Sequence, residues 1–475
     1  MLPRLPMIDD VLLGPAFKGF PLERAPFRVA DTANQHLHLL RGDLPFPCAI
    51  LRAKALDHNS RWYAALTREL EIDFAPHGKT TMAPQIFARQ LRDGAWGITV
   101  GTVQQAWVAA QCGVKRILLA NQIATPGEAR RWLRMLEDDT DLRMISLLDS
   151  QAQLGLLEEA LAGKKAEGCA LARPYSADGV PRPHREPVFE VLIELGRNGG
   201  RSGCRSVEDA FELAQLAAAI RGIRVVGVEA YEGLGATGDS ASDAALVEQW
   251  MGGLEALLLR LERDGFWPAH QAPIVSAGGS SVFDLVADAL VKARARALGS
   301  HGSGQRPWQI ILRSGCYISH DDGSYQRMQH AMEQRGLHRT IREGLRFSCC
   351  PAHSRGSPQG GLQPALEVWA AVQSRPEPGL ALVNMGRRDV GFDAGLPLPV
   401  LHVQRGEVRR APGHWQVNGL NDQHGYLRIE PSDTLQVGDL VGFGVSHPCT
   451  SFDKWRLIWV IDDAYNVMEA VCTYF

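Results

Sequence analysis

The sequence has little of what marks disulfide-rich, membrane or nucleic-acid-binding proteins. It has nine cysteines and no Cys-x-x-Cys pair, so we expect buried thiols rather than a disulfide framework. A net charge of −3, from 50 basic and 53 acidic residues, argues against a nucleic-acid partner. No stretch approaches the length of a membrane span, and the N-terminus lacks the pattern of a signal peptide. We therefore expect a cytoplasmic protein that binds a small molecule, with no nucleic acid and no membrane as partner.

The length and composition are those of a globular protein with a large core. The 475 residues are 45% hydrophobic and 22% charged, which suits one large barrel with an appended domain or two to three smaller domains. The sequence shows no internal repeat at a fixed period, so it does not predict a solenoid or a propeller.

Short apolar runs alternate with amphipathic stretches between residues 46 and 328. The runs have the length of strands and the stretches have the period of helices. We expect the first strand at Cys48–Arg52 and the last at Gln309–Arg313. Eight or nine such units favour an α/β fold with a parallel (β/α)8 barrel over an open sheet. Two interruptions, 164–187 and 294–307, are interpreted as surface insertions.

The pattern changes after about residue 329. Short alternating runs separated by Pro and Gly predict a C-terminal all-β domain over 329–475. We expect residues 1–45 to join this domain, and the barrel to occupy residues 46–328.

Lys79 follows a short apolar stretch at 74–76 that predicts a strand. Barrel enzymes place their chemistry at the carboxyl ends of the strands, and a lysine held there can form a Schiff base with a carbonyl group. Most lysines, however, are solvated surface charges. The spacing alone leaves the two interpretations about equal.

A glycine turn at Gly278, Gly279 and Ser280 follows a late predicted strand and opens a helix. Glycines let the backbone approach an anion, and the free amides of a helix start supply donors. Phosphate sites in such barrels often follow strands seven and eight. Together with Lys79, this turn predicts a phosphorylated aldehyde cofactor, for which pyridoxal 5′-phosphate is the obvious candidate. The alternative is a common turn without a ligand.

Four more polar residues stand at or near the ends of predicted strands. Arg313 could bind an anion and Tyr317 could donate to the phosphate, but a strand-end salt bridge and a core tyrosine explain them equally well. Arg201 and Tyr231 could contact the pyridine ring of the cofactor. A surface position without function explains one of these two at least as well.

His447 and Cys449 predict a metal site. Pro448 favours an extended backbone at His447, and residues two apart in an extended chain point to the same side. Imidazole and thiolate suit Zn²⁺ better than Mg²⁺. Two ligands do not make a structural zinc site, but a catalytic site keeps positions open. A buried histidine and cysteine without metal remain the alternative. Asp422 and His424 could orient the ligands, although solvated loop residues are more common.

Taken in order, four motifs resemble those of the D-serine dehydratase and D-threonine aldolase family. They are Pro76-His77-x-Lys79-Thr80, Gly278-Gly279-Ser280, Arg313-x-Gly315-x-Tyr317 and His447-Pro448-Cys449. The resemblance implies a pyridoxal-phosphate enzyme of the alanine racemase fold type, a metal-assisted reaction and a homodimer. It also implies that Lys79 binds the cofactor covalently, with His77 among the cofactor contacts, and that His447 and Cys449 bind the metal.

Within that family, this chain is similar to the dehydratases in pairing His with Cys, whereas the aldolases typically pair His with Asp. The resemblance therefore implies a dehydratase that converts a D-serine-like D-3-hydroxyamino acid into a 2-keto acid and ammonia. The alternatives are retro-aldol cleavage to glycine and an aldehyde, or a protein that binds pyridoxal phosphate without turnover. A racemase would not need the metal. Asn384, where many members carry an acid, and the two insertions leave room for a bulkier D-amino acid as substrate, such as an aminated sugar acid or a hydroxyaspartate.

Overall fold

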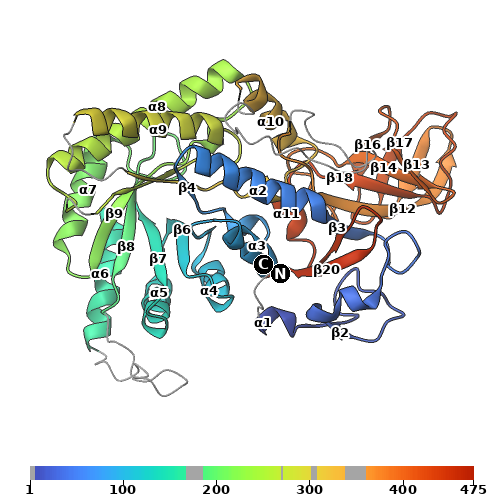
Figure 1. Ribbon diagram of the computed structural model, residues 1–475, viewed down its shortest axis with the longest axis horizontal. Coiled ribbons are helices and arrows are strands. Elements are labelled where there is room, and N and C mark those ends of the chain that lie inside the picture. Colours follow the sequence, from blue (N-terminus) through green and yellow to red (C-terminus); the bar gives the residue numbers. More distant parts are fainter. Residues whose placement is uncertain (1–5, 167–185, 269–270, 301–307, 337–359) are drawn as a thin grey trace. The chain divides into compact units, whose positions relative to one another are not determined.

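The computed structural model describes residues 6–166, 186–268, 271–300, 308–336 and 360–475 (Figure 1). The chain forms two compact units. The barrel unit comprises Leu70–His77 and Ala95–Ser314, and the β unit comprises Met1–Glu69, Gly78–Gly94 and Gly315–Phe475. The chain therefore passes from one unit to the other four times.

The barrel unit contains eight parallel strands in the order β4-β11-β10-β9-β8-β7-β6-β5. A parallel bridge between His77 and Thr99 joins the two ends of this order, with Thr99 N donating to Pro76 O at 2.9 Å. The sheet is therefore closed. Its strands are β4 (Asp73–Phe74), β5 (Ile98–Val100), β6 (Arg116–Gln122), β7 (Arg143–Leu148), β8 (Phe189–Glu194), β9 (Ile223–Glu229), β10 (Ile274–Ala277) and β11 (Gln309–Leu312).

Helices follow the strands along the chain, and α5 to α9 lie outside the strands in Figure 1. Their starts follow from the sequence, because Thr102, Thr125, Ser206 and Asp239 each accept a hydrogen bond from the backbone N–H three residues further on. The helices of this unit are α4 (Val103–Gln111), α5 (Pro126–Asp138), α6 (Gln151–Ala166), α7 (Val207–Ala219), α8 (Ser240–Arg263) and α9 (Phe283–Ser300).

The core inside the barrel is made of small and branched apolar side chains from seven of its strands or their ends. This filled interior is what a closed eight-stranded barrel requires. Its members are Ala75, Leu118, Ala120, Ile145, Leu147, Leu192, Val226, Ile274 and Ile311.

The strand at Cys48–Arg52 does not belong to the barrel, and the prediction that the barrel begins there is wrong. This strand, β3, pairs with β12 (Leu366–Glu377) and β19 (Leu457–Ile461) in the β unit. All five of its residues are buried. A strand buried on both faces has the same apolar pattern in either sheet, so the sequence did not reveal its partners.

The two predicted insertions have different outcomes. Most of 164–187 lies outside the described residues, although α6 continues to Ala166. In the second, α9 extends to Ser300, so the prediction of a surface insertion is wrong for 294–300. Alternating alanine and arginine there are strong helix formers. Residues 301–307 lie outside the described part of the chain.

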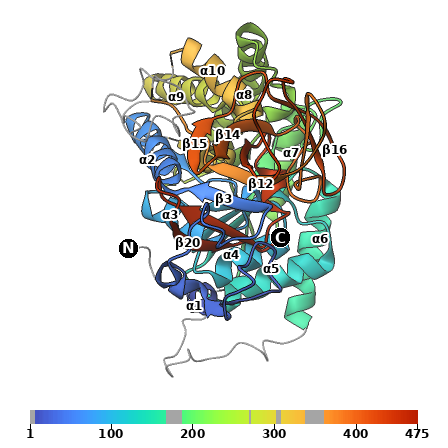
Figure 2. The ribbon, with the colours of Figure 1, turned by 90° about the vertical axis from the view of Figure 1, so that its right-hand side faces the viewer.

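The β unit is built on an antiparallel sheet centred on the long strand β12. One side of β12 pairs with β18, while its other side pairs first with β3 and then with β13. Figure 2 shows β12, β3 and β20 in succession. The remaining strands of this sheet are β13 (Leu380–Val383), β14 (Leu398–Gln404), β15 (Glu407–Arg410), β16 (Gln416–Leu420), β17 (Gly425–Arg428), β18 (Leu440–Gly444) and β20 (Val467–Cys472).

Residues before β3 cover one side of this sheet. Leu13, Phe20 and Phe27 share a core with Trp369 and Trp459, and Trp459 Nε1 donates to Gly19 O at 3.1 Å. The short strands β1 (Leu12–Leu13) and β2 (Phe27–Arg28) pair with each other. The helices of the β unit are α1 (Pro6–Asp9), α2 (Ala53–Glu69), α3 (Pro84–Arg92), α10 (Ser324–Gln334) and α11 (Cys449–Phe452).

An α/β barrel followed by a β domain is thus confirmed. In the described part of the chain, the six cysteines are free thiols, and no helix combines the length and apolarity needed to cross a membrane.

Candidate active site

Most of the predicted cofactor residues of the barrel unit lie where strands end. His77 follows β4, Tyr231 follows β9, the Gly278–Ser280 turn follows β10 and Arg313 follows β11. Arg201 lies in the loop after β8. The carboxyl ends of parallel barrel strands share one face. These residues therefore belong to the face of the barrel that carries chemistry in enzymes of this architecture.

Arg201 and Tyr231 lie together. The guanidinium carbon of Arg201 is 5.0 Å from the centre of the Tyr231 ring, a cation–π geometry. The same ring covers Gly279, where an added Cβ would come within 3.0 Å of it. Gly278 has φ +87°, a conformation that other residues rarely adopt. This packing explains why both positions are glycine.

The glycine turn already binds an anion, the carboxylate of Glu232. Gly279 N donates to Glu232 Oε1 at 2.8 Å and Gly278 N donates to Oε2 at 3.3 Å. Glu232 is only 1% exposed. The amides therefore point at a negatively charged group, which is the chemistry predicted for a phosphate site.

Arg313 is buried in an ion pair with Glu229, and its NH2 also donates to Ala230 O at 2.9 Å. Burial raises the pKa of Glu229 to about 8, while the nearby positive charge of Arg313 acts in the opposite direction. This arrangement fits the alternative interpretation of Arg313 as a strand-end salt bridge.

Tyr317, in the β unit, stacks on Tyr63 with ring centres 4.2 Å apart. It is 1% exposed, and burial raises the pKa of its hydroxyl well above the usual value. The structure thus favours the core-tyrosine interpretation.

Lys79 lies on a short 3-10 helix, Gly78–Thr80, and its side chain is exposed.

Three potential metal ligands gather in the β unit. Nitrogen or sulfur atoms of Cys316, His447 and Cys449 all lie within 4.8 Å of one another. Cys316 Sγ is 3.5 Å from Cys449 Sγ, and Thr80 Oγ1 is 3.4 Å from Cys449 Sγ. The predicted pair His447 and Cys449 is therefore brought together, with Cys316 as an additional neighbour that the sequence did not predict as a ligand.

Asp393 orients His447. Its Oδ2 lies 2.6 Å from His447 Nδ1, and its Oδ1 accepts a hydrogen bond from Thr450. Because Asp393 binds Nδ1, Nε2 is the ring nitrogen that would bind a metal. The residue predicted for this role, Asp422, instead forms an exposed ion pair with Arg388.

The two cysteines differ in acidity. The pKa of Cys449 is lowered by a hydrogen bond with Cys316, and then by Thr80 and the positive charge of Lys79, against the effect of burial. The pKa of Cys316 is raised by its hydrogen bond to Cys449 and by burial. Cys449 is therefore the thiol that ionises first, with the Lys79 charge close enough to assist.

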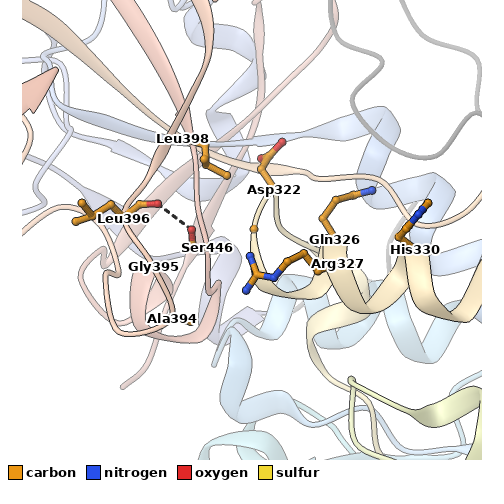
Figure 3. A pocket seen from close by; sticks show the side chains of 10 residues that line it. Asp322, Gln326, Arg327, His330, Ala394, Gly395, Leu396, Leu398 and Ser446 are labelled. Carbon is orange, nitrogen blue, oxygen red and sulfur yellow. Dashed lines mark hydrogen bonds between the residues drawn. The ribbon is translucent and has the colours of Figure 1, made fainter. Parts of the chain in front are cut away.

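A pocket of about 660 Å³ is lined by residues of α10 and by residues next in sequence to Asp393 and His447. Figure 3 shows Gln326 and Arg327 of α10 on one side and Leu396, Leu398 and Ser446 on the other. Arg327 supplies a positive charge at the pocket, while Ser446 directly precedes His447 and Ala394 directly follows Asp393.

The barrel and β domain together define the alanine racemase type of fold. An ala racemase-like protein from Idiomarina loihiensis superimposes with a TM-score of 0.61 and 17% identity, over 90% of this chain and 96% of that one. The D-threonine aldolase structure from Filomicrobium marinum gives a TM-score of 0.68 at 20% identity, over 94% of this chain and 98% of that one.

Sequence comparisons confirm the resemblance to the D-serine dehydratase and D-threonine aldolase family. Residues 365–461 match the family model "Putative serine dehydratase domain". The 3-hydroxy-D-aspartate aldolase of Paracoccus denitrificans (strain Pd 1222) is 23% identical over 400 residues, 83% of this chain and 85% of that protein. The D-threonine aldolase of Arthrobacter sp is 22% identical over 419 residues, which are 88% of this chain and 89% of that protein.

A dehydratase is also among the similar structures. The D-threo-3-hydroxyaspartate dehydratase from Delftia sp. HT23 gives a TM-score of 0.64 at 21% identity, over 92% of this chain and 99% of that one. A cysteine-to-alanine variant of a D-threo-3-hydroxyaspartate dehydratase is known in a metal-free form.

Proposed function

We propose that this protein is a pyridoxal-phosphate- and metal-dependent dehydratase of a D-3-hydroxyamino acid, which it converts into a 2-keto acid and ammonia. The observation that carries the proposal is the cluster of His447, Cys449 and Cys316, with the charge of Lys79 acting on Cys449. A base and a Lewis-acid site at close range suit removal of an α-proton together with loss of a β-hydroxyl group.

Each proposed residue has chemistry that suits one part of the cofactor. Lys79 would bind its aldehyde, the amides of Gly278 and Gly279 with Ser280 would bind its phosphate, and Arg201 with Tyr231 would contact its ring. The two amides can donate to an anion, but in this structure they donate to Glu232, which a phosphate would have to displace. Pyridoxal phosphate, when bound, stabilises negative charge on the substrate carbon that loses its proton. We retain His77, Arg313 and Tyr317 as weaker candidates, since each has a structural role.

The donor set also fits a zinc ion. Thiolate and imidazole ligands suit Zn²⁺ better than Mg²⁺, and Zn²⁺ supplies a Lewis acid that helps an oxygen leave. Asp393 would hold the His447 ring through Nδ1, which leaves Nε2 as the nitrogen that would bind the ion. Lys79 Nζ, when it is not bonded to the cofactor, would be the base that takes the α-proton.

Aldol cleavage is the second candidate function, because both curated relatives named above are aldolases. The pairing of His447 with Cys449 rather than with an aspartate favours the dehydratase. The substrate is proposed to be a small D-amino acid. Arg327 at the pocket would suit a second carboxylate, so a 3-hydroxyaspartate belongs among those tested. We also propose a homodimer.

The test is product analysis with a panel of D-3-hydroxyamino acids and added pyridoxal phosphate. We expect 2-keto acid that disappears after chelation and returns with zinc. Aldehyde and glycine instead would establish the aldolase. Absence of both products from a protein that still binds the cofactor would contradict both reactions.

Two variants separate the proposed roles. Lys79→Ala should lose the visible absorption of bound cofactor, whereas Cys449→Ala should keep that absorption and lose turnover, because the two residues serve different groups. Lys292→Ala, on the exposed surface of α9, and Cys112→Ala, at the end of α4, are matched controls that should change neither. Full activity in Cys449→Ala after exhaustive chelation would show that the metal role is wrong.

A further inference from the structure

We propose that Cys316 is a third protein ligand of the metal, which makes the centre a Cys₂His zinc site rather than a His–Cys pair. This inference deepens the proposed function and rests on its metal site. The match to the family model covers residues 365–461. It therefore includes His447 and Cys449 but not Cys316.

The spacing of the donor atoms fits tetrahedral zinc. With Zn–S bonds of about 2.3 Å and tetrahedral angles, two sulfur ligands lie roughly 3.8 Å apart. The observed separation of Cys316 Sγ and Cys449 Sγ is 3.5 Å, and the His447 donor lies within 4.8 Å of both. Small side-chain adjustments would bring all three donors onto one ion.

The backbone holds the third donor in place. Cys316 begins a short 3-10 helix, Cys316–Ile318, directly after Gly315, and it is 4% exposed. The next residue, Tyr317, is fixed by its stack on Tyr63. Asn59 Nδ2 donates to Ile318 O at 3.0 Å. A donor held on a rigid segment is what a metal site requires.

Three protein ligands leave one tetrahedral position free, the pattern of catalytic rather than structural zinc. Two thiolates also make the site softer, which favours zinc over magnesium or manganese. One alternative to metal binding is that Cys316 is a buried thiol that only forms a hydrogen bond with Cys449. A second alternative is a disulfide between the two cysteines.

Zinc X-ray absorption on the full-length holoprotein distinguishes a zinc ligand from a buried thiol or a disulfide, without any assay of turnover. We expect two sulfur neighbours per zinc at about 2.3 Å in the wild type, and one in Cys316→Ser. Zinc affinity in a chelator competition should fall by at least about tenfold, since loss of even an outer-shell partner typically costs that much. Cys112→Ser, which removes a half-buried thiol at the end of α4, should leave both quantities unchanged.

Replacement by aspartate guards against a folding failure. Cys316→Asp keeps a negatively charged ligand, so its zinc should show one sulfur and an additional oxygen neighbour, with cobalt-substituted protein losing about half of its thiolate charge-transfer absorption. One sulfur in the wild type that persists in Cys316→Ser would overturn the inference. A disulfide between Cys316 and Cys449 in the zinc-loaded protein would overturn it as well. If two sulfurs are found but no dehydratase product forms, the proposed reaction fails while this ligand assignment stands.

Discussion

At the scale of single residues, Glu232 stands out because it occupies the position where the cofactor phosphate is proposed to bind. Its carboxylate accepts hydrogen bonds from both glycine amides. Because both donors already bind this carboxylate, a phosphate would have to displace Glu232 from them. Glu232 would therefore compete with the cofactor.

Glu232→Gln should therefore bind pyridoxal phosphate at least about tenfold more tightly, because two unit charges about 4 Å apart repel by roughly 4 kcal/mol at an effective dielectric constant of about 20. Titration of the cofactor-free protein with pyridoxal phosphate measures this affinity. Glu248→Gln makes the same charge change on an exposed part of α8 and should have no effect. Weaker binding in Glu232→Gln would mean that the carboxylate assists the cofactor instead of competing with it.

The metal ligands that could be predicted from the sequence are those that lie together in one short motif. His447 and Cys449 belong to one short motif, although Pro448 between them has a helical backbone conformation at the start of α11 and not the extended one that we expected. Cys316 and Asp393 lie 133 and 54 residues from their respective partners, and only the fold brings them close. A third cysteine beside a tyrosine at a barrel strand end was a visible signal for Cys316. Nothing local distinguished Asp393 from other loop acids.

At the scale of elements, the start of α10 depends on Asp321. Its Oδ1 accepts hydrogen bonds from the amides of Gly323, Tyr325 and Gln326 at 2.9 to 3.2 Å. Burial nevertheless raises the pKa of Asp321 to about 8, against the effect of these hydrogen bonds. The helix therefore begins at a carboxyl group whose neutral form the fold favours.

The pH dependence of stability follows from this shift. An unfolded aspartate loses its proton near pH 4, whereas folded Asp321 keeps it to about pH 8. Between these values the folded chain binds more protons than the unfolded chain, so the free energy of unfolding contributed by Asp321 falls as pH rises. Denaturant titrations from pH 5 to 8 should show Asp321→Asn, which keeps an acceptor oxygen, gaining stability relative to the wild type as pH rises.

Two further variants check the same helix start. Asp321→Ala loses the acceptor, so its free energy of unfolding should be lower than that of the wild type by about 1 kcal/mol. Asp264→Asn changes an exposed aspartate at the end of α8 and should follow the wild type at every pH. A constant difference between Asp321→Asn and the wild type across this range would show that Asp321 does not titrate there.

Element types were easier to predict than element partners. The last barrel strand, predicted at Gln309–Arg313, is β11 at Gln309–Leu312, because a short apolar run of this length is typical of a buried strand. The strand at Cys48–Arg52 was also found, yet it was assigned to the wrong sheet. Periodicity describes one segment, whereas pairing depends on a strand more than three hundred residues away.

At the scale of the whole molecule, β3 ties the N-terminal region to the C-terminal domain. Arg52 Nε and NH2 donate to the two oxygens of Glu367 on β12 at 2.8 and 3.0 Å, and both side chains are almost fully buried. Removal of one member of a buried ion pair leaves an uncompensated charge, which typically costs about 3–5 kcal/mol. The pairing of β3 with β12 and β19 would be lost as well.

Residues 360–475 should therefore not fold when produced alone, although they contain most of the β domain. Without β3, both β12 and β19 expose an unpaired edge, and the core loses its cover from Leu13, Phe20 and Phe27. We expect aggregation or the absence of a cooperative thermal transition, measured by size-exclusion chromatography and circular dichroism. Co-expression with residues 1–69 should recover soluble β structure, and the same segment carrying Arg52→Ala should recover less because Glu367 stays unpaired. A cooperative transition from residues 360–475 alone would show that the C-terminal domain is independent of β3.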